Sequence, residues 1–160
     1  YTADGDIVYE INPYGSGLFT SQESLSDSRW QPIAQRRVAA LLGSNITLLG
    51  YEVHEERESV TLSLYWQARE RATESYTVFV HLVDGSGNMT AQADSLPDEG
   101  RYLTTAWRQG EVVRDVHRLP VSESHSGDHF VVGMYLLKTM ERLPAVNSAG
   151  ELSDRVILPR

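Results

Sequence analysis

The chain has 160 residues, 41% of them hydrophobic, no cysteine and a formal net charge of −8 at pH 7. This length suits one domain with an extension, and the missing cysteine excludes disulfides, thiolate catalysis and Cys-ligated zinc. The acidic balance argues against a nucleic-acid partner, because phosphate binding needs clustered Lys and Arg, and the only directly adjacent basic pair is Arg36-Arg37. No apolar stretch approaches the ~18 residues that span a bilayer, so we expect a soluble segment. Its start at Tyr1 suggests a fragment of a longer protein.

The N-terminal fifth of the chain carries no regular pattern. Residues 1–32 mix Gly, Ser, Asp, Asn and Pro with scattered aromatics, which predicts an irregular arm. Residues 37–54 could form a short helix entering a strand or two strands about the turn Gly43-Ser44-Asn45, and we favour the hairpin. We therefore divide the chain into an irregular arm or linker over 1–36 and a folded domain over 37–160.

Strand signals then recur at regular spacing, separated by turn residues. This pattern, without a long amphipathic helix, predicts an all-β fold: an antiparallel two-sheet β-sandwich, immunoglobulin-like or jelly-roll-like, of about eight strands. The expected strands cover residues 46–54, 59–68, 76–84, 89–95, 111–121, 129–137, 142–146 and 155–158.

Alternation within two of these strands predicts the core. Strand side chains point alternately to opposite faces, so Trp66 shares a face with Leu62 and Leu64 and should anchor the core. The strand over 76–84 is apolar on both faces, which is typical of a central strand. Its core face should carry Val78, Val80 and Leu82.

His81 lies within that apolar strand, and Asp94 follows the turn of the same hairpin. Pairing about the turn at residues 85–88 places residue 81 near 91 or 92, which leaves Asp94 either slightly further along the neighbouring strand or bonded into the 96–110 loop. A packed or hydrogen-bonded structural histidine is our first interpretation, and a ligand or proton-transfer role is the alternative.

The longest irregular piece, residues 96–110, is the best candidate site. It holds Arg101, Tyr102, Trp107 and Arg108, residue types that stack on sugar rings and hold hydroxyl groups. The competing interpretation is that Trp107 and Tyr102 fold back as a plug over one end of the sandwich. Exposure of these two aromatic side chains distinguishes the alternatives.

The sequence contains only weak signals for nucleotide binding, metal binding or glycosidic cleavage. No Gly-rich loop lies between a strand and a helix, and no Gly-x-Ser-x-Gly elbow occurs, so we expect no nucleotide or other cofactor. His125 and His129 are four residues apart but flank a turn, which favours solvated loop polarity over a metal site. Asp98-Glu99 should be a solvated acidic turn, because adjacent carboxylates diverge and glycosidic cleavage needs two facing one bond. We predict no catalytic and no metal-ligating residue.

Six sequence blocks carry a resemblance to a known family. They read ITLLGYEV, VTLSLYWQA, YTVFVHLVD, AQADSLPDEGRY, AWRQGEVVRDVHRLPV and VVGMYLLKTMERLPAV. In this order they resemble the C-terminal soluble β-sandwich domain of bacterial multi-spanning membrane proteins of the dolichyl-phosphate-mannose mannosyltransferase-like (glycosyltransferase) type. The resemblance covers about residues 41–158. One departure is the turn Leu136-Leu137-Lys138-Thr139-Met140, where the family tends to place a Gly-containing turn.

The resemblance implies signature positions without assigned chemistry: Gly50, Tyr51, Trp66, His81, Asp94, Trp107, Gly110, Glu111 and Asp115. It also implies an extracytoplasmic location and the membrane-embedded part of the parent chain as a partner, with a glycan as a further candidate. The catalytic acids of such transferases belong to that membrane part, so no catalysis transfers here. We expect a non-catalytic accessory domain that scaffolds or makes weak glycan contact, with a carbohydrate-binding module and then a glycan hydrolase as alternatives.

Overall fold

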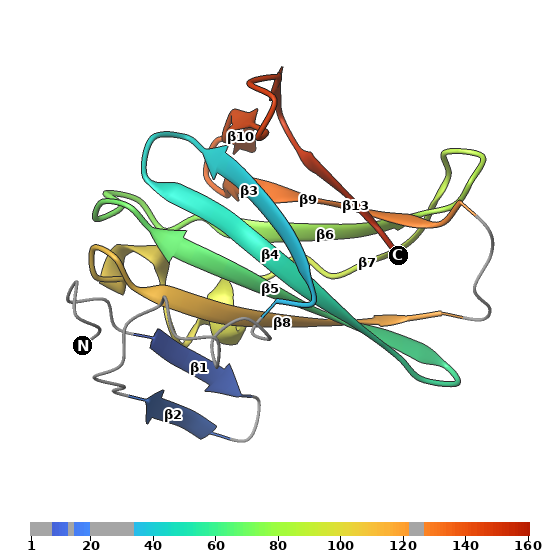
Figure 1. The fold of residues 1–160 in the computed structure, drawn as a ribbon, viewed down its shortest axis with the longest axis horizontal. Helices are drawn as coiled ribbons and strands as arrows, with labels where there is room; N and C mark the ends of the chain where they lie inside the picture. Colours follow the sequence, from blue (N-terminus) through green and yellow to red (C-terminus); the bar gives the residue numbers. More distant parts are fainter. Residues whose placement is uncertain (1–7, 13–14, 20–33, 122–126) are drawn as a thin grey trace.

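The structure is a computed structural model that describes residues 8–12, 15–19, 34–121 and 127–160, and no helix among them is long and apolar enough to cross a bilayer. Its strands form two facing sheets, which confirms the all-β two-sheet sandwich (Figure 1). The first sheet has the order β12 (Leu152–Ser153), β11 (Ala145–Val146), β3 (Arg36–Leu42), β4 (Ile46–Glu55), β5 (Ser59–Ala68), β8 (Val112–Pro120), β1 (Val8–Asn12) and β2 (Gly15–Phe19). The second has the order β10 (Glu141–Arg142), β9 (His129–Leu136), β6 (Thr77–Val83) and β7 (Met89–Gln92), with β13 (Val156–Pro159) also paired to β9.

The core forms where the alternating patterns of β5 and β6 predict it. Trp66 is fully enclosed, although its indole nitrogen has no hydrogen-bond partner in the part of the chain that the structure describes. All six residues expected in the shared core are buried: Leu62, Leu64, Trp66, Val78, Val80 and Leu82. The register of both strands is therefore as predicted.

The favoured hairpin at the start of the domain is also confirmed. β3 and β4 pair antiparallel, with a register shift between Arg37 and Ala40 of β3, and the pairing of β4 with β5 shifts between Leu48 and Gly50 of β4. Gly50 lies at the bulge of β4, where an added Cβ would stand 2.5 Å from the backbone oxygen of Arg36 and 2.6 Å from Cβ of Ala34. Only glycine lets the two strands approach this closely.

Several elements differ from the expectation. The region assigned to an irregular arm contains the hairpin β1–β2, and β1 adds to β8 as a parallel neighbour at the lower left of Figure 1. The strand expected over 142–146 is two short strands, β10 and β11, which join different sheets. β1 and β11 also pair with the distant strands β8 and β3, and local alternation does not report that pairing.

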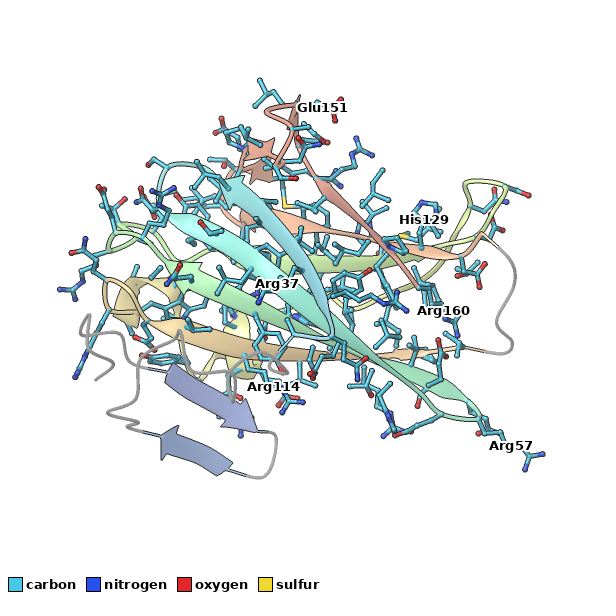
Figure 2. All side chains as sticks on the ribbon, viewed as in Figure 1. Arg37, Arg57, Arg114, His129, Glu151 and Arg160 are labelled. Carbon is cyan, nitrogen blue, oxygen red and sulfur yellow. The ribbon has the colours of Figure 1, made fainter. Side chains whose placement is uncertain are left out.

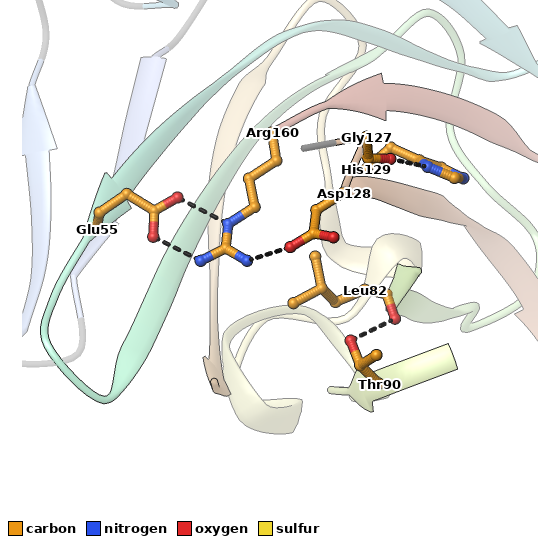
Figure 3. Close-up of polar contacts among 7 residues, drawn as sticks. All are labelled: Glu55, Leu82, Thr90, Gly127, Asp128, His129 and Arg160. Carbon is orange, nitrogen blue, oxygen red and sulfur yellow. Dashed lines mark hydrogen bonds and ion pairs between the residues drawn. The ribbon is translucent and has the colours of Figure 1, made fainter. Parts of the chain in front are cut away.

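Arg160, which follows β13, hydrogen-bonds to residues of both sheets (Figure 3). Its Nε and Nη2 donate to the two carboxylate oxygens of Glu55 at 2.8 and 2.7 Å, and its Nη1 donates to Oδ2 of Asp128 at 3.1 Å. Glu55 ends β4 in one sheet and Asp128 precedes β9 in the other. The Arg160 hydrogen bonds lower the pKa of Glu55, and those to Glu55 raise the pKa of Arg160. Arg57, by contrast, points away from the sandwich at the β4–β5 turn (Figure 2).

Candidate functional site

The segment between β7 and β8 is held by one buried carboxylate. It contains two short 3-10 turns, η2 (Pro97–Gly100) and η3 (Thr104–Ala106). Glu111 lies at the end of this segment and is fully buried. Its carboxylate accepts a 2.6 Å hydrogen bond from the Tyr102 hydroxyl and a 2.7 Å hydrogen bond from the backbone N–H of Arg108. Burial raises the pKa of Glu111, and these two donors oppose that shift. Glu111 therefore closes residues 102–111 into a compact loop.

Trp107 lies inside that loop. Only 1% of it is exposed, it packs within the main core cluster, and its indole N–H donates to the backbone oxygen of Tyr102 at 3.2 Å. Tyr102 is partly buried against the same cluster. This is the arrangement expected of a plug, so a sugar cannot stack on Trp107 while the loop keeps this conformation.

The two arginines of the loop face solvent instead. Nη2 of Arg101 lies 2.8 Å from Oδ1 of Asp98 and 3.9 Å from Oε2 of Glu99, while Arg108 is exposed. The four predicted site residues thus divide into a buried Trp107 with a partly buried Tyr102, and an exposed pair of arginines. They do not form a shared surface of two aromatic rings flanked by guanidinium groups.

Thr104 provides a second anchor that the sequence analysis missed. Its side chain is buried, donates to the backbone oxygen of Glu74 at 2.7 Å and accepts from the backbone N–H of Tyr76 at 3.1 Å. Both partners belong to the chain entering β6. A single threonine in an irregular stretch carries no local signal of this long-range role.

A buried acid and imidazole pair lies under the same segment. Asp115 and His117 alternate onto the inner face of β8, where they are 1% and 3% exposed, and Oδ2 of Asp115 lies 2.7 Å from Nε2 of His117. Oδ1 of Asp115 accepts from the backbone N–H of Asp98 at 3.3 Å. Burial lowers the pKa of His117, but the adjacent Asp115 charge and hydrogen bond outweigh it, so the net pKa is raised.

Asp98 also differs from the solvated turn expected of Asp98-Glu99. Its side chain is only 12% exposed, whereas that of Glu99 projects into solvent. Burial raises the pKa of Asp98, partly offset by Arg101. Both residues have positive φ, 51° and 53°, which turns the chain back over β8.

The expected pairing of His81 with Asp94 is present. Residue 81 lies opposite Gln92 in the β6–β7 ladder, and Nε2 of His81 is 3.4 Å from Oδ1 of Asp94, with 19% and 29% of the side chains exposed. His81 also packs beside the ring of Phe79, 5.2 Å between centroids. Over residues 34–121 and 127–160, no three His, Asp or Glu side chains gather closely enough to hold a metal ion.

The other predicted polar positions are separate from this region. His129 faces the backbone oxygen of Gly127 at 3.1 Å (Figure 3), and His125 lies outside the described residues. Gly110 has a φ of 81° and donates its backbone N–H to Ala68, which explains a glycine immediately before Glu111.

Comparison with protein-family models, with curated proteins and with solved structures finds no match to this chain.

Proposed function

We propose that this chain is a non-catalytic accessory β-sandwich domain of a membrane glycosyltransferase-like protein, with a scaffolding role on the extracytoplasmic side. The proposal rests on the ordered sequence blocks that resemble such domains. In it, the partner is the membrane-embedded part of the parent chain.

The enclosure of Trp107 is the structural observation that favours a scaffold over a sugar-binding surface. The two aromatic residues of the candidate loop that could stack on a sugar ring hold the loop itself: the Trp107 indole N–H donates to the backbone oxygen of Tyr102, and the Tyr102 hydroxyl donates to Glu111. The buried Asp115–His117 pair likewise uses its polar atoms to fasten the segment above it. Side chains committed to internal bonds support a scaffold better than a binding or hydrolytic site.

Crosslinking of the full-length parent protein in native membranes tests the scaffolding role. Photo-reactive residues replace Arg101 and Arg57, which are exposed on different parts of the domain. We expect at least one position to crosslink reproducibly to loops of the membrane-embedded part. Crosslinks confined to this domain, from both positions, would contradict the proposal.

Titration of the isotopically labelled domain with oligosaccharides addresses the alternatives. A scaffold predicts no saturable amide shifts up to about 1 mM, the weakest range expected for one shallow aromatic surface. Saturable shifts confined to residues 101–108 would favour a carbohydrate-binding module instead. Release of reducing sugar that survives repurification would favour a hydrolase.

A further inference from the structure

The second sheet is apolar on its outer face as well as on the face that packs into the core. Successive side chains of a strand point to opposite faces, so the core residues of β6 alternate with residues that point away from the first sheet. On this outer face Phe79, Val131 and Tyr135 are buried in a cluster of their own, and Val83 packs against it. The second sheet therefore lacks the polar outer face that is usual for a sheet in contact with water.

Exposed apolar side chains extend this cluster to both borders of the sheet. Ile157 of β13 pairs with Val131 and is 62% exposed. Met89 of β7 pairs with Val83 and is 55% exposed. Two adjacent rows of paired residues, which we call the uncharged strip, cross the sheet here: Pro159, His129, Val83 and Met89, and then Ile157, Val131, His81 and Gln92. None of these side chains belongs to Asp, Glu, Lys or Arg.

The net charge of the chain makes the uncharged strip suited to a second copy of the same chain. Each copy carries a formal charge of −8, so two copies repel each other wherever acidic surfaces would meet. The strip presents no carboxylate, and its apolar side chains gain free energy by leaving water. Two such strips can therefore meet without placing a carboxylate in the interface.

The two borders of this outer face carry opposite charge. Beside β13, Arg142 and Arg155 flank the carboxylate of Asp154, with nitrogen–oxygen distances of 3.1 and 2.6 Å, which leaves one positive charge in excess. Beside β7, Oδ1 of Asp94 lies 3.4 Å from Nε2 of His81, which leaves one negative charge when the imidazole is neutral. A face with a positive and a negative border is complementary to a copy of itself in which the borders are exchanged.

We propose that the outer face of the second sheet is a homodimer interface, in which the uncharged strips of two copies pack together about a two-fold axis parallel to the strands. This axis brings β7 of one copy over β13 of the other, so each Asp94 meets the border that carries Arg142 and Arg155. An axis across the strands would set β7 over β7, with Asp94 facing Asp94. Facing sheets lie about 10 Å apart, a distance that the side chains of two strips fill. This self-association is separate from the scaffolding contact proposed above.

Sedimentation velocity of the full chain at about 10 µM to 1 mM tests the association, in the concentration range that a small four-stranded interface requires. We expect a reversible equilibrium between monomer and dimer. Ile157→Glu places a carboxylate in the strip and should weaken the dimer at least about tenfold. The matched control Leu152→Glu changes a 74% exposed residue of β12 in the first sheet and should leave the association unchanged. A chain that stays monomeric at about 1 mM, or equal weakening by both substitutions, would overturn the proposal.

Charge reversal and crosslinking test how the two copies are arranged. Asp94→Arg and Arg155→Asp should each weaken the dimer, and the double variant should regain most of the loss, because both borders then change sign together. The chain has no cysteine, so Gln92→Cys and Ile157→Cys each introduce a unique crosslinking site. A bismaleimide that spans about 10 Å, the spacing of facing sheets, should join the first variant to the second more readily than to itself. Losses that add in the double variant, or equally efficient crosslinks between two Gln92→Cys copies, would overturn this arrangement.

Discussion

Gly133 in β9 should resist substitution even by alanine, against the usual trend. A glycine in a strand interior is ordinarily destabilising by about 0.5–1 kcal/mol relative to alanine. Here an added Cβ would stand 2.5 Å from Cζ and 2.6 Å from Cε1 of Phe79, which crosses over Gly133 on the outer face of the second sheet. Non-bonded carbon atoms in van der Waals contact lie about 3.5–4.0 Å apart, so the Phe79 ring would have to move by about 1 Å.

The Phe79 ring has little room for that movement. The guanidinium of Arg142 lies 4.4 Å from its centroid and the ring of Tyr135 lies 6.3 Å away. Overpacking of this kind costs about 1–3 kcal/mol, which exceeds the propensity gain, so we expect Gly133→Ala to lose about 1–2 kcal/mol.

Urea unfolding followed by tryptophan fluorescence measures this loss. If the free energy of unfolding falls by ~2 kcal/mol per molar urea, the urea concentration at the unfolding midpoint should fall by about 0.5–1 M. In a Phe79→Leu background the smaller side chain leaves room for the methyl group, and Gly133→Ala should then be neutral or stabilising. Equal losses in both backgrounds, or a gain in the wild-type background, would refute the packing argument.

Four further outcomes follow from the same contacts. Trp66→Ala should lose about 3–5 kcal/mol of unfolding free energy in urea, and a loss below ~1 kcal/mol would place this ring outside the core. Gly50→Ala should push β4 away from the Arg36 backbone and cost about 1–3 kcal/mol in thermal unfolding, and a loss within about 0.5 kcal/mol would contradict this close approach. Arg160→Met should cost about 1–3 kcal/mol, whereas the exposed control Arg57→Met should stay within about 0.5 kcal/mol; equal effects would dismiss the inter-sheet role of Arg160. Because burial raises the pKa of Glu111 above its ordinary 4.5, its contribution to stability is complete below that pH and falls as the pH rises through the folded value, and Glu111→Gln should flatten this slope.

Strand periodicity was sufficient to predict the part of the core that β5 and β6 supply. The alternation in β5 and β6 identified Trp66 and its neighbours, and the turn after β6 brought His81 to Asp94. These features depend on residues close in sequence, whose spacing determines which face each side chain takes.

The candidate site was harder to predict, because its contacts join distant segments. The plug interpretation of Trp107 was open in the sequence, but its enclosure depends on packing within the main core cluster, whose residues come from both sheets. His117 stood out only as one of five histidines, although residues 115 and 117 necessarily share a face of β8. The structure is needed to show that the segment leading to Asp98 crosses this face of β8, where the backbone N–H of Asp98 donates to Asp115.

Hydrogen exchange of the 96–111 segment at pH 6 tests most directly whether this irregular loop is a fixed structural part of the sandwich. The backbone N–H of Arg108, bonded to Glu111, and that of Asp98, bonded to Asp115, are the two reporters. We predict that both exchange hundreds of times more slowly than in an unstructured peptide, at a free energy of opening of at least about 3–4 kcal/mol. Exchange of both amides within about tenfold of the unstructured rate would show an open loop and contradict the account.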